Sequence, residues 1–150
     1  MGESAAGLVR VSEASTLAVH ALAIMAKYRN DRLSNVAIAK KLDASSHHLA
    51  KVMRKLVKAG FVGSQRGPLG GFRLRVEADD VKLLQIHEAV EGPIPQGRCL
   101  LRRTVCSGIP CPLGLRLCTI QEQLRDCLAG MTLAEFSRTL AISDGPEKDA

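Results

Sequence analysis

The sequence lacks the features that would place a protein in or across a membrane. No run of about 18 uncharged apolar residues occurs, and the nearest, residues 17–25, is interrupted by His20. The first residues, Met1 to Gly7, have neither the basic start nor the apolar stretch of an export signal. We therefore expect a cytoplasmic protein without a membrane partner.

Signatures of catalysis are missing as well. The chain has no glycine-rich motif for nucleotide binding and no convincing acid–base constellation. It has no internal repeat, and its 150 residues suffice for one compact domain with an appendage. An enzyme is therefore not expected, and a small redox enzyme or electron carrier is the weakest functional hypothesis.

Positive charge is concentrated in the first half of the chain. Residues 1–75 contain 13 Lys and Arg against four Asp and Glu, a net charge of +9, whereas residues 76–150 contain eight against 11, a net charge of −3. Lys and Arg that neutralise phosphates release condensed counterions, so a basic half favours a polyanion partner. A solvated basic face is the alternative, and charge alone does not decide between them.

All five cysteines lie between Cys99 and Cys127. In a cytosolic chain this clustering argues against a disulfide framework and for metal or redox chemistry. Soft thiolates bind iron–sulfur clusters, zinc or copper(I). Cys111 stands where an expected helix begins, and the backbone N–H groups there favour a thiolate. Free thiols in a loop are the alternative.

The hydrophobic pattern predicts a mainly α-helical fold with one small β-hairpin. A buried helix capped by Ser12 is followed by two short helices joined by a tight turn, and then by two strands separated by glycines and a proline. A helix-turn-helix followed at once by a hairpin indicates a winged helix-turn-helix domain over residues 9–92. The expected helices and strands of this part are residues 13–28, 34–42, 47–59, 61–66 and 72–75.

The rest of the chain is expected to hold three more helices. They cover residues 82–90, residues 112–128 and a short last segment that begins at the capping box Thr132-x-x-Glu135. We assign residues 93–111 to a cysteine-bearing loop, 112–140 to a dimerisation unit and 141–150 to a disordered tail. A 4-3-4-3 apolar stripe on the long helix predicts pairing with its symmetry mate. The stripe consists of Leu113, Leu117, Ile120, Leu124 and Cys127.

The third helix carries the expected DNA-reading surface. Its apolar residues from Leu49 to Leu56 repeat at core spacing and leave a basic side facing outward. Polar side chains at the start of such a helix meet base edges, and later basic ones contact phosphates. Arg66, beside the hairpin turn, is placed to enter a narrow minor groove. The candidate base-reading residues are Ser45, Ser46, His47 and Lys51, with His48 beside them, and the candidate phosphate contacts are Arg54, Lys55 and Lys58.

From Val9 to Leu140 the chain resembles the Rrf2 family of bacterial regulators. The most specific stretches are LAKVMRKLVKAGFV, residues 49–62, and RGPLGGF, residues 66–72, where the family usually has Gly in place of Leu69. The resemblance implies a homodimer on a palindromic double-stranded DNA operator, with each long helix crossing its mate.

The same resemblance implies an iron–sulfur site. Cluster-binding members carry three cysteines before the long helix, and Cys99, Cys106 and Cys111 occupy that place, so a [2Fe–2S] or [4Fe–4S] cluster is expected. The fourth ligand varies within the family. Here the candidates are His20, contributed by the partner subunit, and Cys118, whereas Cys127 belongs to the apolar stripe.

We therefore expect a dimeric transcriptional regulator whose cluster senses redox state, nitric oxide or iron–sulfur status. A DNA-binding regulator with thiol or structural zinc chemistry, and no cluster, is the alternative. Visible absorbance after anaerobic purification separates the two, because zinc and thiols are colourless there.

Overall fold

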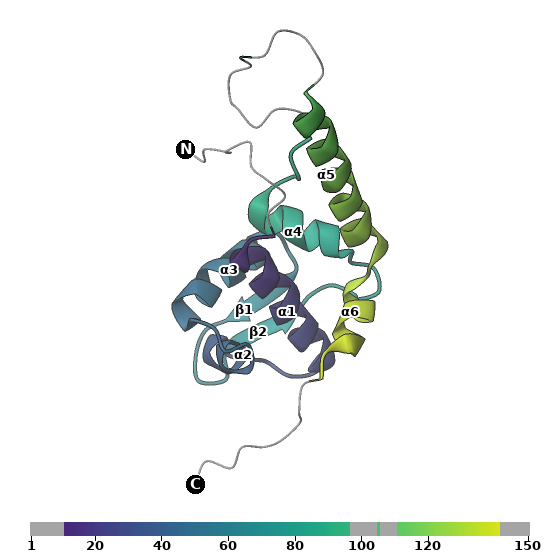
Figure 1. Cartoon of the computed structure of the whole chain (residues 1–150). Helices are drawn as coiled ribbons and strands as arrows, with labels where there is room; N and C mark the ends of the chain where they lie inside the picture. The colour runs from purple at the N-terminus through teal and green to yellow at the C-terminus, as the bar shows by residue number, and fades with distance from the viewer. Residues whose placement is uncertain (1–10, 97–104, 106–110, 142–150) are drawn as a thin grey trace.

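The computed structural model describes residues 11–96, 105 and 111–141. In this part of the chain six helices and a two-stranded antiparallel hairpin follow one another (Figure 1). The elements are α1 (Glu13–Lys27), α2 (Asn35–Lys41), α3 (Ser46–Lys58), β1 (Val62–Gln65), β2 (Gly71–Leu74), α4 (Leu83–Glu91), α5 (Pro112–Gly130) and α6 (Leu133–Thr139). The expected mainly α-helical fold with a hairpin wing is confirmed.

Short polar side chains set the beginnings of the helices. The hydroxyls of Ser12, Ser34 and Ser45 accept hydrogen bonds from backbone N–H groups three residues on, at 3.0, 3.1 and 3.3 Å. These bonds satisfy donors that have no partner within the helix. At the other end of α3, Gly60 has φ +87°, a left-handed conformation that suits glycine.

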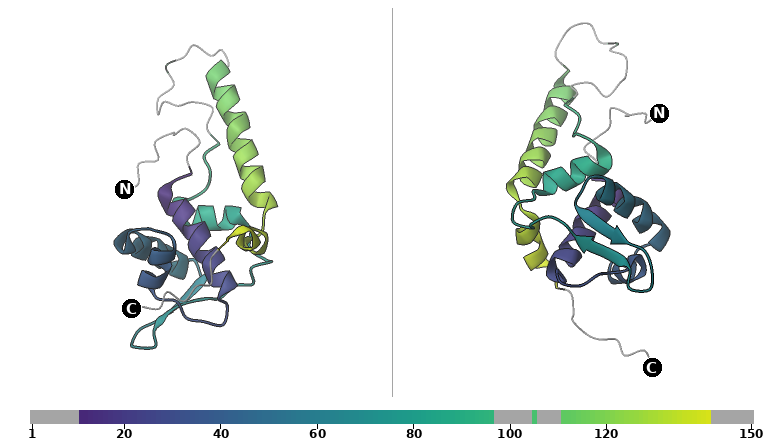
Figure 2. Two further views of the ribbon diagram at one scale, coloured as in Figure 1. Left: turned by 60° about the horizontal axis from the view of Figure 1, so that its bottom comes forward. Right: turned by 180° about the vertical axis from the view of Figure 1, so that it is seen from behind.

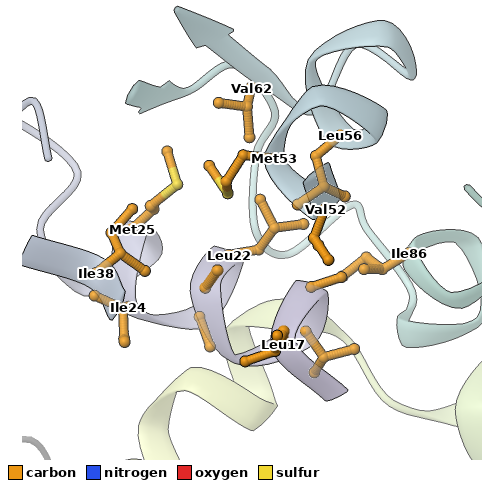
Figure 3. Packing of buried hydrophobic residues seen from close by; sticks show 14 of the residues in the cluster. Leu17, Leu22, Ile24, Met25, Ile38, Val52, Met53, Leu56, Val62 and Ile86 are labelled. Atoms are coloured by element: carbon orange, nitrogen blue, oxygen red, sulfur yellow. The ribbon is translucent and has the colours of Figure 1, made fainter. Parts of the chain in front are cut away.

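The hydrophobic core lies around α1. Side chains from α2, α3, α4, α6 and the hairpin pack against this helix. Figure 3 shows Leu22 of α1 among Met53 of α3 and Ile86 of α4, and all three are fully buried. Because α3 buries one side against α1, its opposite side faces solvent.

The hairpin has one inner and one outer face. Val62 pairs with Leu74, and both side chains are buried on the inner face that meets the core. The segment before α2 forms an isolated β-bridge with β2, because Leu33 exchanges backbone hydrogen bonds of 3.0 and 2.8 Å with Phe72. Gly71 permits this contact, since a Cβ there would lie 2.8 Å from the Leu33 carbonyl oxygen.

Helix α5 projects from the winged helix unit: it begins at the far end and runs back towards α6, which packs against the unit. Figures 1 and 2 show α5 extending beyond α4, while α6 lies beside α1. Backbone hydrogen bonds from Leu133 to Val81 and from Ala134 to Ala78, 2.8 and 3.0 Å long, fasten α6 in place. No helix within the described ranges is long and apolar enough to cross a bilayer.

Two sequence-based assignments fall mainly outside the described residues. Most of the cysteine-bearing loop, residues 97–104 and 106–110, belongs to this group, and so does the tail after residue 141. The expected long helix 112–128 extends two residues further, to Gly130.

Candidate nucleic-acid interface and cysteine site

The first turn of α3 presents its polar residues to solvent. Ser45 caps the helix, and Ser46, His47 and Lys51 are exposed along one side. The side-chain amide of Asn35 donates to the Ser46 carbonyl over 2.7 Å, which fixes the start of α3 relative to α2. The base-reading candidates therefore share one accessible surface held by a rigid turn.

Two of the expected outward residues have partners on other elements. His48 Nδ1 lies 3.6 Å from a carboxylate oxygen of Glu13 in α1. The Lys55 ammonium donates over 2.7 Å to the Val90 carbonyl, near the C-terminal end of α4. These contacts link α3 to its neighbours. Lys55 is nevertheless exposed, as are Arg54 and Lys58 on the same helix.

The hairpin turn holds Arg66 at the surface beside the start of the connection between β1 and β2. Leu69 at the same turn is 86% exposed. A protruding turn with a neighbouring guanidinium has the shape and charge that a minor groove accepts. Helix α3 and the turn thus present two separate basic surfaces.

Cys111 begins α5. Its Sγ accepts a hydrogen bond of 3.4 Å from the Gly114 N–H, so the thiol caps the helix. The expected position of Cys111 at the start of this helix is thus the observed one. Cys99 and Cys106 lie outside the described residues, and no group of three or more His, Cys, Asp or Glu side chains gathers within them.

The two candidate fourth ligands have different surroundings. His20 Nδ1 lies 2.7 Å from the Thr16 carbonyl and donates to it, so Nε2 is the ring nitrogen that this bond does not use. Its ring meets Phe136 of α6 edge-on, with centroids 5.1 Å apart. Cys118, two turns after Cys111, is half-buried with its Sγ 3.8 Å from a carboxylate oxygen of Glu122.

The apolar stripe of α5 is open in the single chain. Leu113 and Ile120 are 55% and 46% exposed, Cys127 is exposed, and the other two members are half-buried. Leu115, outside the stripe, is 45% exposed as well. A continuous apolar strip of this kind is unusual on the surface of a monomer.

Sequence reasoning missed a buried polar pair between α1 and α4. Ser15 and His87 are 2% and 5% exposed, and the Ser15 hydroxyl lies 2.8 Å from His87 Nδ1. It also missed the arginines around the hairpin, although the alternation Phe72-Arg73-Leu74-Arg75 is the signal of a strand with one charged face.

A helix-turn-helix with a polar, basic leading turn, followed directly by a protruding hairpin, defines a winged helix DNA-binding regulator. The chain belongs to the Rrf2 family, whose model is described as an iron-dependent transcriptional regulator and matches residues 11–139. The proposed resemblance is thereby confirmed, and so is its class of function: transcriptional regulation by a DNA-binding protein.

Individual relatives agree with this assignment. An HTH-type transcriptional regulator of Aquifex aeolicus is 35% identical over 129 residues, which are 83% of this chain and 89% of that protein. The HTH-type transcriptional regulator IscR of Vibrio atlanticus is 30% identical over 115 residues, which are 75% of this chain and 66% of that protein.

Solved structures share the fold. CymR, the global cysteine regulator of B. subtilis, matches with a TM-score of 0.71 at 24% identity, covering 89% of this chain and 99% of that one. IscR of T. potens matches with a TM-score of 0.68 at 24% identity, covering 87% of each chain.

Proposed function

We propose that the chain is a homodimeric regulator that binds a palindromic operator and carries an iron–sulfur cluster on Cys99, Cys106 and Cys111. The cluster adjusts operator affinity in response to redox state, nitric oxide or iron–sulfur status. The observation that carries the proposal is the position of Cys111 between the cysteine-bearing segment and α5, where its sulfur accepts a helix N–H.

The DNA contacts of this proposal come from two elements. Ser45, Ser46, His47 and Lys51 read bases from the start of α3, and Arg66 enters the minor groove from the hairpin turn. Arg54 and Lys58 contact phosphates and position the protein without specifying sequence. His48 and Lys55 are assigned to packing, because their side chains meet Glu13 and Val90.

Dimerisation is supported by the open stripe on α5. Pairing of two stripes about a twofold axis buries Leu113, Leu117, Ile120, Leu124 and Cys127 and removes their apolar surface from water. A twofold dimer also presents two α3 helices, which matches the symmetry of a palindromic operator. A single half-site would supply only half of these contacts.

The donor set fits an iron–sulfur cluster. Three cysteines within 13 residues supply soft thiolates, and Arg98, Arg102 and Arg103 in the same segment can offset their negative charge. A bound cluster supplies reversible electron transfer and reactivity towards nitric oxide and oxidants. His20 of the partner subunit is the preferred fourth ligand, because its Nδ1–H bond to Thr16 fixes the ring with Nε2 available.

Anaerobic purification with iron and sulfide analysis tests the proposal. The wild type should be coloured and contain iron and acid-labile sulfide, and Cys99→Ser, Cys106→Ser and Cys111→Ser should each lose both. Cys127→Ser is the matched control and should keep them. A colourless wild type that still binds DNA, with affinity altered by thiol oxidation or by zinc removal, would establish the thiol or zinc alternative instead. The family of IscR and the fold of CymR are compatible with both.

A further inference from the structure

Four arginines gather around the outer face of the hairpin, and we call them the outer arginine group: Arg29, Arg32, Arg73 and Arg75. Arg73 lies opposite Gly63 in the strand register. Leu33 pairs with Phe72, so the same antiparallel alignment brings Arg32 beside Arg73. The first two members come from the connection between α1 and α2, and the other two come from β2 and the residue after it.

The group surrounds an open hollow with a volume of about 540 Å³. Gly63, Ser64 and Gln65 line it together with the four arginines. Gly63 leaves room for the side chain of Arg75, because a Cβ there would lie 2.8 Å from Nε of Arg75. Walls of guanidinium and backbone groups suit an anion, whereas sites for small apolar ligands are enclosed by hydrophobic side chains.

The positive charge of the group is only partly neutralised. Arg29 forms an ion pair with Glu77, and a hydrogen bond and charge attraction between the two raise the pKa of Arg29 and lower that of Glu77. Asp79 adds a weaker attraction for Arg29. Within the described part of the chain, no ion pair to an acidic side chain joins Arg32, Arg73 or Arg75. Like charges facing one another across strands are destabilising, so an external anion would relieve repulsion here.

The location of the outer arginine group on the hairpin indicates which anion it would bind. Helix α3 packs against the inner face of the hairpin through Val62, and successive strand residues point to opposite faces, so Arg73 and Arg75 face away from α3. The rear view of Figure 2 shows the hairpin in front of α1, with this face uncovered. When the turn enters a minor groove and α3 occupies the adjacent major groove, the outer face looks onto the strand beyond that minor groove.

We propose that the outer arginine group binds DNA phosphates on the far side of the minor groove from α3. The hairpin would then contact the duplex through its turn and also through its outer face. Guanidinium groups suit this task because they make forked hydrogen bonds to phosphate oxygens. This inference rests on the proposed DNA binding by α3 and the hairpin turn, and it adds a third set of contacts to them.

Phosphate neutralisation tests the proposal. A duplex is selected from a random library by the wild-type protein, and each phosphate in turn is replaced by an uncharged methylphosphonate. One set of replacements should weaken binding by the wild type but not by the double variant Arg32→Gln, Arg73→Gln. The double variant should also show a shallower dependence of log affinity on log salt, by about 1 for each phosphate that its side chains no longer neutralise. Both arginines are exposed, so its thermal midpoint should match the wild type.

Two controls separate this proposal from the proposed function. Lys58→Gln should lose sensitivity at a different set of phosphates, and Arg138→Gln on α6 should lose none. If the wild type enriches no duplex, the DNA-binding model itself fails. If it enriches one but the double variant keeps the complete wild-type phosphate map, the outer arginine group does not contact DNA. A thermal shift by tripolyphosphate that disappears in the double variant, with that map unchanged, would instead assign the group to a free polyanion.

Discussion

Two lysines on α3, Lys55 and Lys58, differ in what their ammonium groups meet. Lys55 donates to the Val90 carbonyl, whereas Lys58 is exposed on the helix. We expect Lys55→Met to lower the free energy of unfolding by about 1 kcal/mol, because it removes one hydrogen bond from a charged donor. Lys58→Met should leave stability unchanged and should weaken binding to all DNA sequences about equally.

Urea denaturation and salt-dependent DNA binding distinguish the two lysines. The slope of log affinity against log salt should fall by about 1 for Lys58→Met and stay at the wild-type value for Lys55→Met. A reduced slope in Lys55→Met, with unchanged stability, would return this lysine to the DNA interface.

Glu135 carries a pH dependence of stability. The Thr132 backbone N–H, followed by the Thr132 hydroxyl, holds the pKa of its carboxyl below the ordinary value of 4.5. A lowered pKa in the folded state means that the ionised carboxylate stabilises the fold above about 4.5. That stability is lost as pH falls through the folded pKa.

The variant Glu135→Gln isolates this contribution. In urea denaturation it should be less stable than the wild type near neutral pH, and the difference should shrink as pH falls below about 4.5. Glu122→Gln, an exposed site on α5, serves as the control. A difference between wild type and Glu135→Gln that stays constant with pH would show that the carboxylate charge contributes nothing.

Residues with local partners could be predicted from the sequence, and residues with distant partners could not. Ser12 and Ser45 bond to backbone three residues away, so their cap signals are readable directly. Lys55 meets a carbonyl 35 positions away, and Ser15 meets a histidine 72 positions away. A helical pattern shows which side of α3 is polar, but it does not contain those partners.

At the scale of elements, the leading turn of α3 and the hairpin turn should contribute differently to recognition. His47→Ala and Lys51→Ala remove groups that we expect to meet base edges, so these variants should select different sequences from a random library. Arg54→Ala should select the same sequences with lower affinity. Unchanged selection by both His47→Ala and Lys51→Ala would shift base reading to the serines or to the hairpin.

How well the bounds of each element could be predicted also depends on whether the signal is local or distant in the sequence. The bounds of α3 and the start of α6 are predicted well, because Gly60 follows the end of α3 and the box from Thr132 to Glu135 begins α6. The β-bridge between Leu33 and Phe72 was not predicted, since it depends on a residue distant in the sequence and on the space left by Gly71. The cysteine site is predicted by chemistry and family resemblance, and only Cys111 of its three cysteines lies within the described residues.

At the scale of the whole molecule, the open stripe on α5 is the surface that we propose pairs with a second subunit. Ile120 is 46% exposed, so Ile120→Asp should leave the fold of the single chain intact while placing a charge in the proposed dimer interface. We expect monomers by sedimentation and loss of binding to a selected operator. Gln123→Asp, at an exposed position on the same helix, is the matched control and should remain dimeric. An Ile120→Asp dimer of wild-type stability would locate the interface elsewhere.

The position of His20 bears on whether the proposed cluster site is built by one subunit or by two. Its ring contacts Phe136 of α6, which follows the C-terminal end of α5, whereas Cys111 lies at the N-terminal end. The 19 residues of α5 span about 28 Å at 1.5 Å per residue, and Figure 1 shows α6 far from the start of α5. Within one chain His20 is therefore remote from Cys111, so only a partner's His20 could complete the coordination.

Mixed dimers test this arrangement. Subunits carrying His20→Ala and Cys111→Ser are coexpressed with different tags, and the hybrid is isolated by two affinity steps. Each homodimer should lack a complete site, but the hybrid should regain one, from the cysteines of the first subunit and the histidine of the second. Iron and sulfide content should then be about half of the wild-type value, since one of the two sites is rebuilt. A hybrid without iron would exclude ligation across the dimer. Full iron in the His20→Ala homodimer, with loss of iron in Cys118→Ser, would assign the fourth ligand to Cys118.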